Sequence, residues 1–189
     1  MPTEHIEAPR EVPDRQQPGR RLCAILLNPA LRSMATTITY RNVEAALQLV
    51  SCTELALTNL LDLATKDAPE LNRSTISNQG IEAARDQISQ ALLGADEVLL
   101  AWGTGGMTGP VRTVLRAQTE WLFDALKERR IGHVWTITDK PRHPSRWRQY
   151  VGPEKQRVTG DTFEERLSKV LIKTSLSSAA GRVIFDRAF

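Results

Sequence analysis

Four short apolar runs, each followed by a turn-rich gap and a segment of helical period, constrain the fold of this chain most. The runs cover residues 22–27, 54–58, 97–102 and 133–138. Each is apolar at both odd and even positions, which is typical of strands covered on both faces. A repeated strand–helix order implies right-handed crossovers and a parallel sheet. We therefore expect a three-layer α/β/α domain with a four-stranded parallel sheet.

Each run is followed by one expected helix, so the sheet should lie between two helical layers. Asn78 is the expected cap of the second helix, and Pro110 is the expected first residue of the third. Asp161 with Glu164 resembles a capping box that opens the fourth. The residues that these helices are expected to bury are Val43, Ala46, Leu47, Val50, Ile81, Ala84, Ile88, Ala91, Leu92, Val111, Val114, Leu115, Leu122, Ala125, Leu126, Phe163, Leu167, Val170 and Leu171.

The two ends of the chain differ from its middle. Residues 1–19 combine four prolines with charged residues and Gln, and such a composition buries too little apolar area to offset its ordering entropy, so we expect a flexible tail. Residues 20–175 are expected to form a single domain. Residues 176–189 form a C-terminal extension, whose apolar Val183, Ile184 and Phe185 either dock on the core or leave with the tail.

Composition excludes several classes of protein. The longest unbroken apolar stretch, residues 22–27, is far shorter than the ~20 residues of a membrane span, and the first residues lack the apolar segment of a secretory signal. We therefore expect a soluble, cytoplasmic protein. Cys23 and Cys52 lie in or beside apolar stretches, and the histidines show no ligand spacing, so we predict no metal, no iron–sulfur cluster and no other cofactor.

Polar side chains and a glycine-rich turn follow the four runs. They are Asn28-Pro29, Asn59, Gly103-Thr104-Gly105-Gly106 and His143-Pro144-Ser145. Because ligands of open parallel sheets bind beyond the carboxyl ends of the strands, we expect a site there. The usual catalytic motifs are missing: Thr108 breaks the dinucleotide spacing, no Lys-Ser or Lys-Thr pair completes a phosphate loop, and no G-x-S-x-G elbow exists.

An amide-rich pocket with one histidine suits a planar heterocycle. The carboxamide of Asn59 can donate to and accept from a pyrimidine edge, Asn28 can hold a water, and His143 can donate to charge that develops on a leaving base. These groups fit hydrolysis of an N-glycosidic bond in a flipped nucleotide. Each also has a plainer interpretation, because Asn often caps strand ends and a histidine in a basic loop is often solvated.

Positive charge concentrates beside His143, although the formal net charge is only +3. Residues 140–157 hold one acid, Glu154, against six basic residues, which are Lys140, Arg142, Arg146, Arg148, Lys155 and Arg157. Such a run is often a solvated face, but next to the expected site we predict that it holds DNA phosphates, with Trp147 as a wedge or base platform. The residues that we expect to contact the base are Pro29, Asn59, Tyr40, Trp102, Gly103 and Ser145.

Over residues 21–147 the chain is similar to an uncharacterised prokaryotic and phage family, domain of unknown function 1643. The matching stretches are Leu27-Asn28-Pro29, Asn59-Leu60-Leu61 with Ala64-Thr65-Lys66, Ala101-Trp102-Gly103, and Lys140-Pro141 followed by His143-Pro144. That family usually follows its first motif with Asp-Pro-Thr and an Arg. Here Thr37-Ile38-Thr39 precedes Arg41, so the family's Asp is missing.

The layout also resembles the uracil-DNA glycosylase superfamily, which implies a four-stranded parallel sheet. Asn28-Pro29 resembles the Asn-Pro of mismatch-specific members, which implies that Asn28 positions the water. Asn59 falls at the base-reading position, Asn72-Arg73 resembles the Asn-Arg of thermophilic-type members, and His143-Pro144-Ser145 matches the last motif. The cluster cysteines are missing, no Gly precedes Asn28 by two residues, and no aromatic residue follows Pro29 directly.

We therefore predict a monomeric DNA glycosylase that flips and excises a uracil, a mismatched pyrimidine or a modified pyrimidine. Its setting would be DNA repair or antiviral defence against modified foreign DNA. One alternative is a hydrolase of free nucleosides or nucleotides. Another is a non-catalytic module that binds nucleic acid or nucleotides, which the missing Asp favours.

Overall fold

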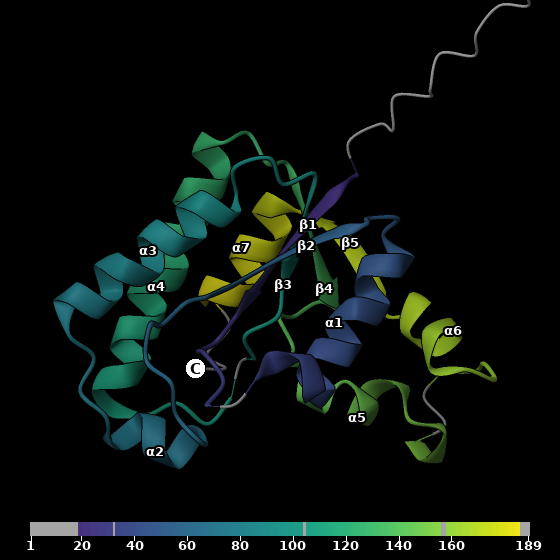
Figure 1. Ribbon diagram of the computed structural model, residues 1–189, viewed down its shortest axis with the longest axis horizontal. Coiled ribbons are helices and arrows are strands. Elements are labelled where there is room, and N and C mark those ends of the chain that lie inside the picture. Colours follow the sequence, from purple (N-terminus) through teal and green to yellow (C-terminus); the bar gives the residue numbers. More distant parts are fainter. Residues whose placement is uncertain (1–18, 32, 104, 156–157, 186–189) are drawn as a thin grey trace, which may run out of the picture.

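The computed structural model describes residues 19–185 apart from residues 32, 104 and 156–157, and shows an α/β fold around one sheet (Figure 1). The sheet has five strands in the order β2-β1-β3-β4-β5. Their bounds are β1 Arg21–Leu26, β2 Glu54–Asn59, β3 Glu97–Leu100, β4 His133–Ile137 and β5 Leu171–Ser175. The strands β1 to β4 run parallel, as the apolar runs predict, and β5 runs antiparallel to β4.

The fifth strand corrects the prediction of four strands. The helix expected to bury Val170 and Leu171 ends at Ser168, and the chain turns at Lys169 and Val170 to enter β5. Leu171 then pairs with Ile137 across the antiparallel ladder. A short apolar run fits both a helix and a strand, and the free edge of β4 decides in favour of the strand because it offers unpaired backbone groups.

Helices cover both faces of the sheet. The layer of α1, α5 and α6 lies on one face, and the layer of α3, α4 and α7 lies on the other (Figure 1). The helix bounds are α1 Ile38–Leu49, α2 Ala68–Arg73, α3 Asn78–Ala91, α4 Gly109–Glu128, α5 Arg148–Val151, α6 Phe163–Ser168 and α7 Leu176–Phe185, with 3-10 helices η1 Met34–Thr36, η2 Pro144–Arg146 and η3 Pro153–Lys155. The expected three layers are therefore present.

The core is divided in two by the sheet, because successive side chains of a strand point to opposite faces. In β1, Cys23 and Ile25 belong to the core under α3 and α4, whereas Leu22, Ala24 and Leu26 belong to the core under α1 and α6. All five are at most 3% exposed. Burial on both faces explains why this run is apolar at every position.

All three expected helix starts are shifted by one residue. Ser77, not Asn78, caps α3 by accepting a hydrogen bond from the Gly80 amide. The capping box of α6 is formed by Thr162 with Glu165 rather than by Asp161 with Glu164. Pro110 lies in the first turn of α4, which begins one residue earlier, at Gly109. These helices form where the pattern predicts, and local hydrogen bonds set their first residue.

The expected tail falls almost entirely on residues 1–18, which lie outside the described residues. In the C-terminal extension, Leu176–Phe185 forms α7, and Leu176, Ala179 and Ala180 pack against the core beside α4. This part of the extension therefore docks on the domain. No described helix has the length and apolar character needed to span a membrane.

Candidate functional site

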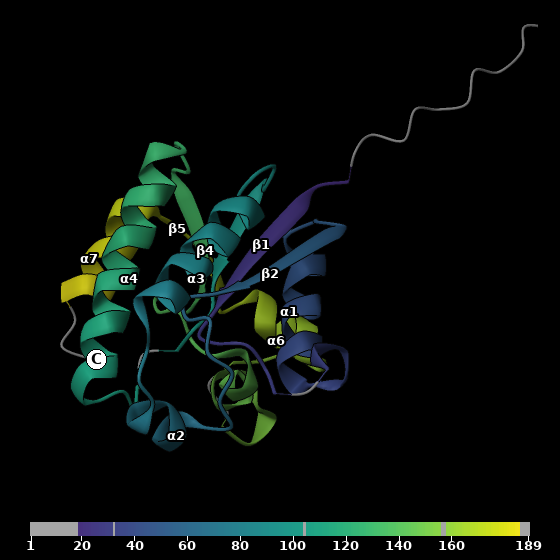
Figure 2. The same cartoon turned by 60° about the vertical axis from the view of Figure 1, so that its left-hand side comes forward.

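The carboxyl ends of β1 to β4 meet at one edge of the sheet, where the polar residues singled out from the sequence lie. Figure 1 shows α2 and α5 near this edge, and Figure 2 shows α2 there from a second direction. We refer to it as the carboxyl edge. The backbone of β2 continues to pair with β1 beyond the strands, since the Leu61 amide donates to the Leu27 carbonyl (3.0 Å). The loops after β1 and β2 are therefore tied together.

Asn28 is half-buried just beyond β1, and its amide nitrogen is fully engaged. Nδ2 donates to the Leu63 carbonyl (3.2 Å) and to Thr65 Oγ1 (3.1 Å). Because a carbonyl only accepts, these contacts fix which end of the carboxamide carries the nitrogen. Asn28 thus offers Oδ1 alone as an acceptor to a ligand, and the half-buried Pro29 stiffens the turn that follows.

Asn59 is the last residue of β2 and lies beside Leu26 in the strand register. Its Oδ1 atom is buried and has no hydrogen-bond partner among the described residues. Buried polar oxygens are normally paired, and an exception calls for a water or a ligand that completes it. Asn28 and Asn59 therefore sit on adjacent strand ends, each with an oxygen that the described part of the chain leaves unused.

His143 lies in the loop after β4, half-buried, with its ring held by Ser145. The backbone amide of Ser145 donates to Nδ1 (3.3 Å), and Ser145 Oγ lies 2.9 Å from the same atom. An amide can only donate, so Nδ1 is the acceptor and Nε2 carries the ring proton. Burial, and to a smaller extent the charge of Arg146, lowers the pKa of His143 below its ordinary value of 6.5. The ring is therefore neutral near pH 7 and presents an Nε2–H donor.

A close approach of two backbones brings His143 to the end of β3. The amide of Gly103 donates to the Pro141 carbonyl, and a Cβ on Gly103 would lie 3.2 Å from the Cβ of His143. Gly103 has φ +87°, a conformation that costs side-chain-bearing residues energy. The glycine at this position thus lets the His143 loop lie against the end of β3, one strand away from Asn28.

Three residues hold the carboxyl edge in place, although the sequence predicted no such structural role for them. Thr65 accepts from Asn28, as described above. Asn42, a buried residue of α1, donates through Nδ2 to the Pro144 carbonyl (2.7 Å). Asn72, whose resemblance to a glycosylase motif suggested a site role, instead bonds the Gly106 carbonyl (2.7 Å) and the Thr108 amide (2.9 Å). A polar residue on the apolar face of α1 was the available signal for Asn42.

The aromatic candidates lie mostly inside the protein. Trp147 has no exposed surface and donates through Nε1 to the Arg142 carbonyl (2.8 Å), so it is a core residue and not a wedge or base platform in this conformation. Trp102 is 1% exposed, and its Nε1 has no partner among the described residues, so it presents no open stacking face. Tyr40 is half-buried in the first turn of α1.

The predicted phosphate-binding residues divide into two kinds. Arg146 and Arg148 are exposed, whereas the guanidinium of Arg142 lies over the ring of Tyr150 at 4.8 Å. Lys140 is half-buried at the end of β4. Arg157 lies outside the described residues, and for Lys155 only the backbone is described.

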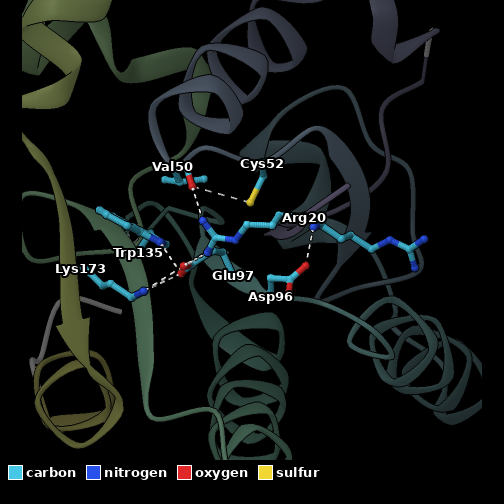
Figure 3. Close-up of polar contacts among 8 residues, drawn as sticks. Arg20, Val50, Cys52, Asp96, Glu97, Trp135 and Lys173 are labelled. Atoms are coloured by element: carbon cyan, nitrogen blue, oxygen red, sulfur yellow. Dashed lines mark hydrogen bonds and ion pairs between the residues drawn. The ribbon is translucent and has the colours of Figure 1, made fainter. Parts of the chain in front are cut away.

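A second polar cluster lies at the opposite, amino-terminal edge of the sheet, around the buried carboxylate of Glu97 (Figure 3). It accepts hydrogen bonds from Arg20 Nη2 (2.6 Å), Trp135 Nε1 (2.8 Å) and Lys173 Nζ (2.9 Å). Burial by itself raises the pKa of Glu97, but the donors outweigh it and hold the pKa below its ordinary value. With its charge satisfied by neighbours, this cluster has a structural role.

A cavity of about 750 Å³ lies between α4, α7 and the start of β4. Phe123, Ile131 and Leu176 form its apolar floor, and Lys127 and Arg130 stand at its rim. The described residues that line it include none of those predicted from the sequence to form a site. We therefore take the carboxyl edge as the candidate functional site.

Comparison with known proteins identifies a family without assigning an activity. A family model described as "Protein of unknown function (DUF1643)" matches residues 10–145, more than two thirds of the 189-residue chain. The match includes Asn28, Asn59 and the His143-Pro144-Ser145 segment. Neither a curated protein nor a solved structure matches the chain.

Proposed function

The chain belongs to the DUF1643 family, and from that premise and the carboxyl-edge geometry we propose that it is a DNA glycosylase-like hydrolase. The proposed reaction cleaves the N-glycosidic bond of a flipped pyrimidine. The resemblance of Asn28-Pro29, Asn59 and His143-Pro144-Ser145 to uracil-DNA glycosylase motifs gives the reaction class. The four parallel strands that carry these residues support the comparison without establishing it.

In the proposed mechanism the water is held by Asn28. Its Nδ2 is committed to Leu63 and Thr65, so Oδ1 accepts a hydrogen bond from the water and directs a lone pair toward the sugar. An amide cannot take a proton at neutral pH. The reaction therefore relies on an oxocarbenium-like state, in which the sugar carries positive charge and a weakly activated water is sufficient. As the C–O bond forms, the proton that the water loses neutralises the base anion released by cleavage of the C–N bond.

The leaving base is handled by Asn59 and His143. The buried Oδ1 of Asn59 accepts a hydrogen bond from a ring N–H of the base. The Nε2–H of His143 donates to a base oxygen and stabilises the negative charge that develops as the bond breaks. A neutral donor suits this role, because it stabilises the anion without a proton transfer.

One observation carries the proposal: Ser145 fixes the tautomer of His143. His143 is the N-cap of η2, so its Nδ1 accepts the Ser145 amide, and burial lowers its pKa. The arrangement keeps one donor, at a defined atom, on the same sheet edge as two unused amide oxygens.

The test is a base-excision assay on duplexes and single strands that contain uracil, a mismatch or a hypermodified pyrimidine. We expect abasic product with one of these substrates. Asn28→Ala and His143→Gln should each lower the single-turnover rate by about 10²–10³-fold, the usual loss for one positioned hydrogen-bonding group.

A matched control is His133→Gln, which makes the same change at an exposed histidine of the opposite edge. It should retain the wild-type rate. If no substrate yields an abasic site, or if Asn28→Ala cleaves as fast as the wild type, the glycosylase proposal is wrong. Cleavage of free nucleosides alone would select the nucleoside hydrolase instead.

A further inference from the structure

The exposed arginines of the carboxyl edge have no partners. Five exposed arginines lie at this edge and make no side-chain ion pair or hydrogen bond within the described residues. They are Arg41, Arg73, Arg112, Arg146 and Arg148. All five lie at the start of a helix, in η2, or at the end of α2. Free guanidinium groups gathered at one edge create a positive field that a polyanion can neutralise.

At the amino-terminal edge, several cations are paired with acids. There Arg20 and Lys173 pair with Glu97, and Arg21 pairs with Glu54. Lys127 and Arg130 are exposed near the last turn of α4, where the helix dipole favours cations. At the carboxyl edge, Arg41 and Arg112 are instead in the first turns of α1 and α4, where the dipole favours anions.

These arginines stand on both helical layers. Arg41 and Arg146 belong to the side of α1, because α1 contacts η2 and Asn42 bonds the Pro144 carbonyl. Arg73 and Arg112 belong to the side of α4, because Asn72 ties α2 to the loop that opens α4. The proposed site lies between the two groups, at the ends of the strands.

In the described residues, none of the acids of the same edge forms an ion pair with these arginines. Asp67 accepts from the Glu70 amide and Glu70 accepts from the Lys66 amide, so both serve to cap α2. Asp139 is half-buried beside Thr138. Asp62 is exposed after β2 and Glu154 is exposed in η3, and neither side chain has a bond in the described residues.

We infer that the two arginine groups hold the phosphates of one nucleic acid on both sides of the site, so that the strand crosses the carboxyl edge from the α4 layer to the α1 layer. This inference rests on the proposed function and extends it to Arg73, Arg112 and Arg41. Packed layers lie about 10 Å apart, so the groups are on the order of 20 Å apart. That span corresponds to about six phosphates of a strand and exceeds the reach of a mononucleotide.

The test measures the salt dependence of binding to a fluorescein-labelled DNA of about 20 nucleotides, single-stranded and duplex, between about 50 and 200 mM salt. Two double variants remove one group each: Arg73→Gln with Arg112→Gln, and Arg41→Gln with Arg146→Gln. Each should lower the log–log salt slope by about two, since each phosphate contact contributes about 0.9.

The control is Lys127→Gln with Arg130→Gln, which removes the same charge from the opposite edge and should leave the slope unchanged. Thermal unfolding checks that all variants fold. A normal slope for the Arg73/Arg112 variant, equal loss for the control, or failure of both DNA forms to bind would each overturn the inference. Binding needs no turnover, so a missing abasic product with intact slopes would reject only the glycosylase proposal.

Discussion

At the scale of single residues, Gly103 links the backbone to the chemistry of the edge. Its positive φ turns the chain at the end of β3, and its missing Cβ lets the His143 loop approach. Gly105, two residues away, lies outside the left-handed region, and a Cβ there would meet no atom within 4 Å. The same residue type thus has different roles at neighbouring positions.

Gly103→Ala should lower the free energy of unfolding by about 1–3 kcal/mol, because an alanine is strained at this φ and its Cβ crowds His143. Gly105→Ala should change it by less than about 1 kcal/mol. Urea titration of both variants makes the comparison. Equal losses for the two substitutions would show that His143 does not depend on the Gly103 turn.

At the scale of elements, α6 shows how two overlapping signals compete. The sequence offers Asp161 with Glu164 and Thr162 with Glu165, which are capping boxes one residue apart. The structure uses the second: Thr162 accepts from the Glu165 amide, and Glu165 accepts from the Asp161 and Thr162 amides. The start of α6 then places Leu167 in the core and lets the chain enter β5 after Val170.

Thr162→Ala should therefore cost about 1 kcal/mol, the usual loss of a helix cap, whereas Asp161→Ala should cost little because its side chain has no bond in the described residues. Chemical denaturation of the two variants measures the difference. A larger loss for Asp161→Ala would mean that the capping box has the other register.

At the scale of the whole molecule, the Glu97 carboxylate joins the start of β1 to β3, β4 and β5 (Figure 3). It is 7% exposed, whereas Arg20 and Lys173 are 48% and 43% exposed. The cations therefore stay solvated while the carboxylate receives their hydrogen bonds. This contact secures the antiparallel edge strand at the end of the molecule far from the proposed site.

Glu97→Gln should destabilise the protein by about 1–3 kcal/mol at neutral pH, because charge-assisted bonds from Arg20 and Lys173 are weakened. The pKa of Glu97 is lowered on folding, so its contribution is present above the ordinary value of 4.5 and disappears as pH falls through the folded value. The difference from wild type should thus shrink in acid.

Glu54→Gln is the control, since it breaks an exposed pair with Arg21 and should cost under about 1 kcal/mol. Urea unfolding at several pH values measures both variants. A constant Glu97→Gln penalty down to strongly acidic pH would contradict the assigned role of the carboxylate.

The sequence predicts much of this fold because the deciding information is local. Apolar residues at both odd and even positions predict the four parallel strands. Helical spacing predicts α1, α3 and α4, because burial of Val43, Ile88 and Leu115 depends on which face of the helix each residue occupies. The strand order of a parallel sheet also puts Asn28, Asn59 and His143 on one edge. The same pattern predicts their common location before any contact is known.

Only the tertiary structure decided the remaining features, because they depend on contacts that form only when the chain is folded. Leu171 became a strand residue by pairing with β4, and Trp147 became core because the loop folds back so that its indole reaches the Arg142 carbonyl. The tautomer of His143 and the carboxamide orientation of Asn28 follow from bonds to Ser145, Leu63 and Thr65. Residue type supplies each polar group, but only a folded neighbour fixes which of its atoms remains free.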